Sequence, residues 1–456
     1  MRSRSTLVAS VLALLSLWSG SGSAVETLSL AQALERATAN DPRINERTHL
    51  VDVARATLQQ AEGSNGWMID ANTFLGVTPS IDGGFFEGEG CQPGNCVVRS
   101  DRFSPNSFSP WFSLNFSLIK PLNTFGKIEN YSEAARGNIV VKQNDVVIQR
   151  AATRLDVYRA YYGYLAARDS RLLLQDVKNR LQRAMETVQR WLDEEEGSVK
   201  QSDLFALQSG NALAARYLAQ AEGLANVAMS GLKTLTGVAA EQELALADER
   251  LVPVPLPELK LEEMQQQALV NRPEIMQVEA ALRARRALVE AKKSEHWPSL
   301  YAGVVGAFAR SPNRAHLDNP YIPDIFNDYG VTPIVGLRWD WDPAVQQSKV
   351  AEAQAELEAL VAKSEFARRG IPFEVSEQYY QVQSYHQAVE QLEEATRSAR
   401  RWMVASYTDF EAGLEKPEKI LTALQAYVLA HTDYVRTVYD YNMHVAKLEN
   451  AAGTIP

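Results

Sequence analysis

The sequence lacks a long hydrophobic run anywhere past its first 24 residues. No later stretch approaches the roughly 18 consecutive apolar residues that mark a candidate membrane-spanning helix. A transmembrane helix is therefore not expected in the rest of the chain. Helices and closed barrels are the two structures that satisfy their backbone groups in lipid, so any bilayer crossing would use β-strands.

Basic charge and histidine are also scarce. The formal net charge is −10 and there are six histidines, scattered along the chain without a His-Glu-x-x-His pattern. An acidic chain is a poor partner for nucleic acid, whose phosphates need a basic face. No glycine-rich loop leads into a helix that could hold a phosphate. We therefore expect no catalytic residues, no cofactor and no metal, and we predict that the protein is not an enzyme.

Only two cysteines are present, Cys91 and Cys96, and they flank Gln92-Pro93-Gly94-Asn95. Proline followed by glycine at the central positions indicates a type II turn, which would make the two cysteines cross-strand neighbours. In an oxidising compartment we expect them to form a disulfide. Two free thiols in a surface loop are the alternative.

Residues 1–24 have the pattern of a secretory signal peptide. Arg2 and Arg4 precede the 12-residue apolar stretch Leu7–Trp18, and small residues follow up to Ala24. This stretch is too short to span a bilayer, which takes about 20 residues. We expect cleavage after Ala24 and a mature protein outside the cytoplasm, either soluble or inserted in a membrane as strands.

The chain contains an internal duplication, which predicts the domain boundaries. Three sets of residues in the first half recur in the same order in the second. They are Leu28, Leu30, Ala37, Asn40, Pro42 and Ile44 with Leu259, Leu261, Ala268, Asn271, Pro273 and Ile275; Val157, Tyr161 and Tyr162 with Val375, Tyr379 and Tyr380; and Gly197 and Gly237 with Gly413 and Gly453. We assign a first repeat to residues 25–240, a Pro-rich connector to 241–258 and a second repeat to 259–456.

Each repeat is predicted to run helix, two strands, long helix, turn, helix. In the first long helix an apolar seam with 3-4 spacing indicates a coiled coil, and it consists of Leu174, Val177, Leu181, Ala184, Val188 and Trp191. The turns are expected at Gly197 and Gly413, where glycine suits a left-handed residue that ends a helix. Ser198 with Gln201 fits a capping box for the next helix.

The predicted strands cover residues 70–87 and 104–120 in the first repeat and 299–310 and 331–342 in the second. Apolar residues alternate with polar ones, as in Phe112, Leu114, Phe116 and Leu118 against Ser113, Asn115 and Ser117, and the second repeat continues the pattern to Trp339 and Trp341. An ordinary half-buried sheet is the simpler interpretation. However, each strand pair interrupts two long helices, so a membrane barrel is favoured. Four strands would leave open edges in lipid, whereas three chains would supply twelve strands.

The predicted fold is therefore mainly α with a membrane β-barrel. Duplicated long α-helical hairpins form coiled coils, and four β-strands per chain contribute to a trimeric 12-stranded barrel. Asp193, Glu194, Glu195 and Glu196 end the first long helix, where carboxylates oppose the helix dipole. They form either a solvated acidic turn or an acidic mouth, charged by three such clusters, that favours cations.

Three segments carry a resemblance to a known family. They are the Leu-Ser-Leu-x-x-Ala-Leu-x-x-Ala-x-x-x-x-Pro pattern of residues 28–42, Pro121-Leu-Asn-Thr-Phe-Gly126, and the turn from Gly197 to Asp203. They resemble outer-membrane efflux proteins of the TolC family. The resemblance implies a homotrimer in the outer membrane with a periplasmic helical tunnel. It also implies a passive exit duct of a tripartite efflux or type I secretion system, docked to a periplasmic adaptor (membrane fusion) protein and an inner-membrane transporter. A periplasmic coiled-coil adaptor and a structural coiled-coil protein are the alternatives.

The resemblance also implies where the adaptor binds. Contact is expected at the periplasmic turns, through Gly197, Ser198, Asp203, Gly413 and Leu414. Some family members narrow the closed tunnel with two aspartates after the second turn glycine. Lys419 and Thr422 stand at those positions, so a carboxylate ring is not expected there.

Overall fold

The computed structural model describes residues 26–81, 103–195, 199–314, 316 and 323–454. Cys91, Cys96, Glu196, Gly197 and Ser198 lie outside these residues. The chain divides into two compact units, of which the first contains Met1–Thr48, Asn144–Met276 and Glu365–Pro456 and the second His49–Gln143 and Gln277–Ser364. None of the described helices is long and apolar enough to cross a membrane.

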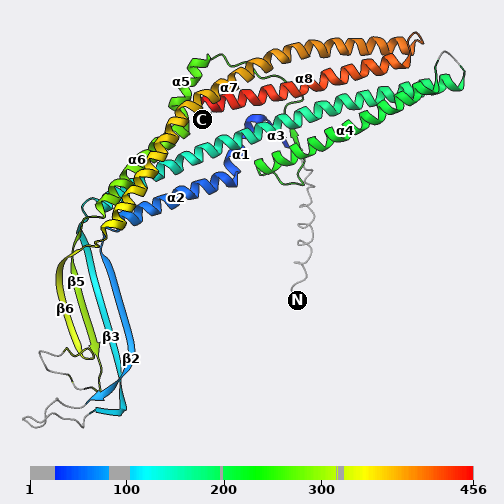
Figure 1. Cartoon of the computed structure of the whole chain (residues 1–456). Helices are drawn as coiled ribbons and strands as arrows, with labels where there is room; N and C mark the ends of the chain where they lie inside the picture. Colours follow the sequence, from blue (N-terminus) through cyan, green and yellow to red (C-terminus); the bar gives the residue numbers. More distant parts are fainter. Residues whose placement is uncertain (1–25, 82–102, 196–198, 315, 317–322, 455–456) are drawn as a thin grey trace, which may run out of the picture. The chain divides into compact units, whose positions relative to one another are not determined.

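The two halves of the chain contain matching helices in the same order (Figure 1). The pairs are α1 (Leu30–Asn40) and α5 (Leu261–Asn271), of 11 residues each; α2 (Pro42–Gly63) and α6 (Pro273–Ser294), of 22 each; α3 (Lys127–Asp193) and α7 (Pro343–Glu411), of 67 and 69; and α4 (Gln201–Thr236) and α8 (Pro417–Ala452), of 36 each. The predicted duplication of long helical hairpins is confirmed.

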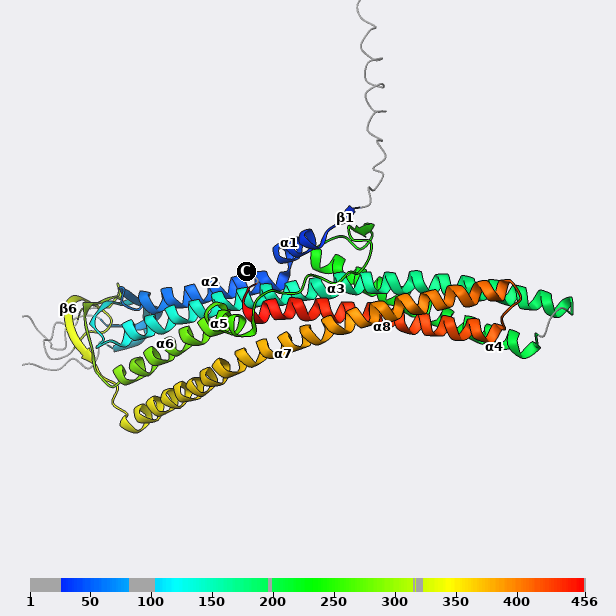
Figure 2. The same cartoon turned by 90° about the horizontal axis from the view of Figure 1, so that it is seen from above.

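In the first unit the long helices pack as two hairpins, α3 with α4 and α7 with α8 (Figures 1 and 2). The predicted seam of α3 is confirmed: Leu174, Val177, Leu181, Ala184 and Val188 are all at most 6% exposed. Trp191 is half-buried, and its ring meets that of Phe410 edge-on at 5.1 Å. The short helices repeat the symmetry, because α1 contacts α4 and α5 contacts α8.

A small parallel sheet in the first unit ties the start of the chain to the connector. Its strands are β1 (Glu26–Leu28) and β4 (Leu244–Leu246). Three-residue strands are too short to show a period of two, so the sequence did not reveal them. Asn442 of α8, 1% exposed, fixes the following segment by accepting from the Val254 N–H at 3.0 Å and donating to the Val252 carbonyl at 2.9 Å.

The second unit contains a four-stranded antiparallel sheet with the order β2-β3-β5-β6. The strands are β2 (Met68–Ile81), β3 (Phe103–Asn123), β5 (Ser299–Arg310) and β6 (Asp328–Arg338). The expected strand end at residue 342 is wrong. Ser299, the first residue of β5, pairs with Arg338, so no partner remains for later residues. Trp339 instead donates from Nε1 to the His296 carbonyl at 3.1 Å, and its ring packs on Trp341 at 4.8 Å.

Candidate functional site

The sheet of the second unit has one apolar and one polar face. Paired residues of neighbouring strands share a face, and the face alternates along each strand. The apolar face carries Ile69, Leu75, Val77, Phe112, Leu114, Phe116, Leu118, Phe308, Tyr329, Val331, Val335 and Leu337. Its edge-strand members are open to solvent in a single chain; Leu75 is 83% exposed and Tyr329 85%. The predicted alternation of the strands is therefore confirmed.

The opposite face is mostly polar over the middle of the sheet, where Phe74 and Val305 are apolar exceptions. Asp70, Asn72, Asn115, Ser117 and Thr332 line a hollow of about 460 Å³ there. Water or a polar solute suits this surface, whereas the apolar face requires an apolar covering. An ordinary soluble sheet would bury its apolar face and expose the polar one.

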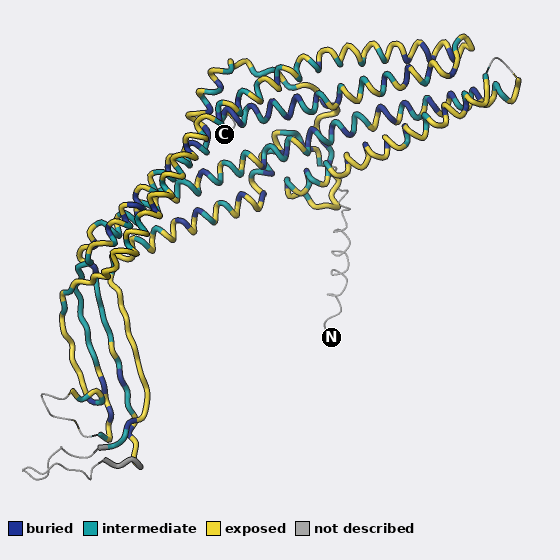
Figure 3. The backbone as a smooth tube through the Cα atoms, in the orientation of Figure 1, coloured by how far each residue is buried: buried dark blue, intermediate teal, exposed yellow. Residues whose placement is uncertain are grey.

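The two edge strands have no neighbour on their outer side among the described residues. β2 pairs only with β3, and β6 pairs only with β5. Figure 3 shows the consequence, with the tube exposed along most of β2 and β6 and less exposed along β3 and β5. One chain thus presents two open edges, which proteins normally cover or pair.

The residues that cap α4 after the first helical turn differ from the predicted ones. Helix α3 ends at Asp193, the side chains of Asp193, Glu194 and Glu195 are exposed, and Glu195 has a left-handed φ of 52°. Ser198 does not precede α4 directly. The N-cap is Lys200, whose backbone N–H donates to Asp203 Oδ2 at 2.9 Å. The expected Ser198–Gln201 capping box is wrong, because α4 begins at Gln201 itself and the carboxylate of Asp203 satisfies the free N–H.

The second helical turn follows the expected pattern. Gly413 has a left-handed φ of 72° just after α7 ends, and Pro417 is the first residue of α8. Leu414 between them is 79% exposed. Lys419 Nζ of α8 lies 2.6 Å from Oε2 of Glu415, which precedes the helix, so the lysine that follows this turn is paired with a carboxylate of the turn itself.

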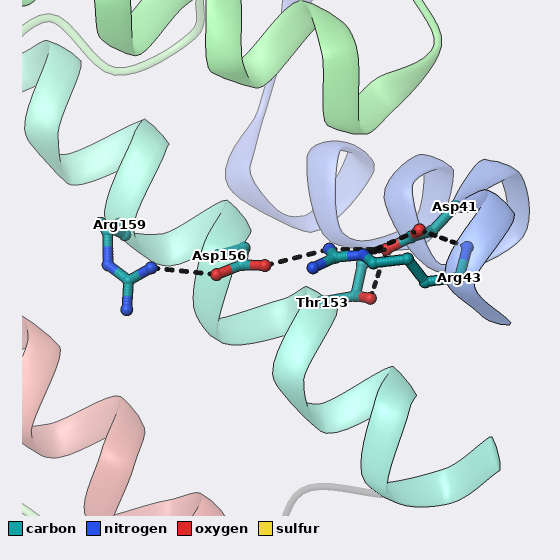
Figure 4. Close-up of polar contacts among 5 residues, drawn as sticks. All are labelled: Asp41, Arg43, Thr153, Asp156 and Arg159. Atoms are coloured by element: carbon teal, nitrogen blue, oxygen red, sulfur yellow. Dashed lines mark hydrogen bonds and ion pairs between the residues drawn. The ribbon is translucent and has the colours of Figure 1, made fainter. Parts of the chain in front are cut away.

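A buried carboxylate fixes the junction between α1 and α2 to α3, as drawn in Figure 4. Asp41 has a side chain only 3% exposed, and it accepts from Arg43 Nη2 at 2.8 Å and Thr153 Oγ1 at 2.5 Å. Burial alone would raise the pKa of Asp41, but the hydrogen bonds from Arg43 and Thr153 outweigh it and hold that pKa below the ordinary value. Arg43 continues to Asp156 at 3.0 Å, and Asp156 accepts from Arg159 at 3.0 Å. We call these five residues the first clasp.

The second repeat has a corresponding clasp between α5, α6 and α7. Arg272, with a side chain 8% exposed, donates from Nη2 to Glu274 at 2.7 Å and from Nη1 to Glu374 at 2.5 Å. Burial would lower the pKa of Arg272, but its two carboxylate partners raise it. The sequence analysis missed both clasps. The signal that could have revealed them lies in two equivalent segments of the repeats, Asp41-Pro42-Arg43 and Arg272-Pro273-Glu274. Each has opposite charges on the two sides of a proline, and the order of the charges is reversed between the repeats.

Three histidines lie along α7 and α8 in the first unit: His386, His431 and His444. The His444 ring stacks on Tyr385 at 5.0 Å, and burial lowers its pKa. His431 lies between Tyr427 and Tyr434, and burial, then Arg250 and Arg400, lower its pKa. Within the described parts of the chain, no three His, Cys, Asp or Glu side chains cluster as metal ligands would.

Comparison with known proteins gives a family for the second half of the chain. Residues 264–454 match the family model described as outer membrane efflux protein. This region of the chain is an outer membrane efflux protein domain. The resemblance inferred from the sequence is thereby confirmed. The family description names an efflux protein and no catalytic activity, in agreement with the prediction that the protein is not an enzyme.

Solved structures extend the likeness of the efflux protein domain to nearly the whole chain. The outer-membrane channel OprN is similar over 93% of this chain and 89% of its own, with a TM-score of 0.72 and 16% identity. The CmeC outer membrane channel of Campylobacter jejuni is similar over 93% of this chain and 85% of its own, with a TM-score of 0.73 and 13% identity. The open MtrE outer membrane channel of Neisseria gonorrhoeae is similar over 93% of this chain and 88% of its own, with a TM-score of 0.69 and 15% identity. No curated protein sequence matches the chain.

Proposed function

We propose that the chain is one protomer of a homotrimeric duct in the outer membrane. The observation that carries the proposal is the four-stranded sheet, which has an exposed apolar face and two unpaired edges. In lipid, each edge must find a partner. The strands alternate in direction, so β6 of one copy can pair antiparallel with β2 of the next. Three copies then close a barrel with an even number of strands, as bacterial barrels have.

The helical hairpins would form the periplasmic tunnel of the same trimer. Helix α4 exposes large apolar side chains along its length, among them Phe205 at 59%, Leu224 at 63% and Val227 at 70%. Such residues on a long helix favour packing against further helices over permanent contact with water. In the proposed trimer, neighbouring hairpins cover them.

The two turns are proposed as the periplasmic ends that contact the adaptor (membrane fusion) protein. The residues concerned are Gly197, Ser198 and Asp203 in the first turn and Gly413 and Leu414 in the second. Leu414 supports this role because its apolar side chain is 79% exposed at the turn, where a partner protein can cover it. The acidic residues 193–196 would line the tunnel mouth and favour cations.

The complete system in this proposal is a tripartite efflux or type I secretion assembly. An inner-membrane transporter, driven by protons or by ATP, would load the substrate, and the duct would conduct it passively. The alternative of a periplasmic adaptor or structural coiled coil leaves the exposed apolar face of the sheet unexplained.

The barrel is tested by placing one charge on each face of β2. Leu75→Arg puts a cation on the apolar face, where arginine costs about 2–4 kcal/mol in the middle of a bilayer. Asn72→Arg is the matched control on the polar face. We expect Leu75→Arg to reduce the yield of heat-modifiable trimers in the outer membrane and Asn72→Arg to preserve it. Equal trimer yields, or a monodisperse monomer of the unaltered protein in mild detergent, would refute the duct.

The docking role is tested by a photo-crosslinking residue at position 414 in living cells, with position 224 on α4 as control. We expect an adaptor adduct only from position 414. Adducts from neither position, with normal export, would show that the turns serve only to reverse the chain.

A further inference from the structure

The two described ends of the connection between β5 and β6 lie against the sheet. These ends, residues 311–314 and 324–327, are here called the strap. Arg314 Nη1 donates to the Pro79 carbonyl at 3.0 Å and lies 3.4 Å from Thr78 Oγ1. The backbone N–H of Asn313 donates to Ser109 Oγ at 3.0 Å. The strap thus bonds to both β2 and β3, across the sheet from the strands that it joins.

Internal contacts hold the two ends of the strap together. Asn327, 7% exposed, accepts from the Ser311 N–H at 2.9 Å and donates from Nδ2 to the Arg314 carbonyl at 3.3 Å. The Arg314 guanidinium lies over the Phe326 ring at 4.3 Å, and that ring meets Trp111 edge-on at 5.4 Å. Hydrogen bonds, a cation–π contact and an aromatic pair therefore fix the same few residues.

The strap covers the polar face of the sheet. Thr78 pairs with Ser109, and by alternation both lie on the same face as Asn72 and Asn115. Thr78 is 1% exposed and Ser109 0%, whereas Val77, which faces the other way, is 71% exposed. Trp111, which pairs with Gly76, lies on this same face. The strap therefore covers polar side chains together with one aromatic ring, and it leaves the apolar face bare.

We propose that Arg314 and Phe326 line and narrow the outer mouth of the conduit. This inference rests on the proposed function, because it takes the apolar face to meet lipid and the polar face to meet the lumen. The strap lies at the end of the sheet where β2 and β3 are joined to each other, away from their connections to α2 and α3. Each protomer would add one guanidinium and one aromatic ring there, so the mouth is both narrower and more positive than the bare strands would make it.

The test is single-channel conductance and ion selectivity of the full-length trimer in planar lipid bilayers. Arg314→Ala should raise the conductance and shift the selectivity toward cations, because it removes bulk and positive charge from the lumen. Asn327→Ala should raise the conductance with a smaller shift, because it loosens the strap and keeps the charge. Arg310→Ala is the matched control, since Arg310 is exposed and pairs with Phe112 on the apolar face.

If Arg314→Ala fails to assemble, Arg314→Lys keeps the charge but has no planar fork to reach Thr78 and Pro79 together. It should raise the conductance at unchanged selectivity. Wild-type conductance in assembled Arg314 and Asn327 variants would overturn the inference and leave the duct standing. A trimer of the unaltered protein that conducts no ions would overturn the proposed duct, and this inference with it.

Discussion

Asp41 and Arg272 occupy equivalent places in the two repeats and carry opposite charges. Each stands between two helices and precedes the proline that starts the second one. Asp41 pairs with Arg43 and Arg272 pairs with Glu274, so the partner two residues later is reversed as well. In both repeats an arginine then reaches a carboxylate of the long helix, Asp156 or Glu374. The arginine–carboxylate bridge is thus kept although the residues that form the junction exchanged charge.

Removing the buried carboxylate of the first clasp should destabilise the protein. Asp41→Ala removes the acceptor that Arg43 and Thr153 share and leaves the buried Thr153 hydroxyl without it, at a cost of about 1–3 kcal/mol. Asp52→Ala on α2, which removes a 56% exposed carboxylate paired with Arg55 at 3.0 Å, should change the stability by about 0.5 kcal/mol or less. Thermal unfolding of both variants in detergent measures the difference. Equal losses would show that burial of Asp41 contributes nothing.

The charge order of the second clasp can be introduced into the first clasp by two substitutions. The double variant Asp41→Arg with Arg43→Glu copies the arrangement of Arg272 and Glu274, with Asp156 in the place of Glu374. We expect it to unfold at a higher temperature than either single variant, because the arginine again reaches both carboxylates. Additive losses from the two single substitutions would contradict the equivalence of the clasps.

The stability contributed by Asp41 should depend on pH in a defined direction. Its pKa in the folded protein lies below the ordinary value. The stabilisation is therefore fully present above the unfolded pKa of about 3.9 and is lost as the pH falls through the folded pKa. Asp41→Asn should remove this dependence, so the unfolding temperatures of the variant and the unaltered protein should converge in acid. A constant difference down to pH 3 would contradict it.

His431 should make the protein less stable at mildly acidic pH. Its pKa is lowered, so the unfolded chain takes up a proton near pH 6.5 before the folded chain does. Stability should therefore fall as the pH drops below about 6.5 toward the folded pKa. His431→Gln should reduce that slope without abolishing it, because the pKa of His444 is also lowered. His49→Gln, at an exposed position on α2, is the comparison for the same substitution outside the buried part of α8.

Glycine is required at the second helical turn for its backbone conformation. A Cβ at Gly413 would meet open space, but the backbone φ of 72° at this position is unfavourable for any residue with a side chain. Gly413→Ala should therefore lower the stability by about 1–2 kcal/mol. Gly223→Ala, which adds the same methyl group in open space inside α4, should stabilise by about 0.5–1 kcal/mol. Opposite shifts in unfolding temperature are expected. If the turn is also the docking end, Gly413→Ala should lower export while trimers persist.

Close packing of the strands depends on glycines of the sheet. A Cβ at Gly303 would collide with the backbone of β3, at the Leu118 carbonyl and 2.9 Å from Ile119 Cα, whereas a Cβ at Gly330 of β6 meets nothing within 4 Å. Gly303→Ala should therefore cost about 1–3 kcal/mol through overpacking, and Gly330→Ala should be tolerated. The fraction of trimer that survives heating in detergent reports both, and equal survival would contradict the packing argument.

The sequence by itself determined the duplicated helical hairpins, the seam of α3, the left-handed Gly413 and the two faces of the sheet. Each of these follows from a local periodicity or a local backbone conformation that neighbouring residues impose. Tertiary structure decided the rest. The end of β6 depends on where β5 begins, and the clasps join residues more than a hundred positions apart, as with Asp41 and Thr153. The strap lies on the polar face because Arg314 finds acceptors on β2, and no pattern along the chain encodes that meeting.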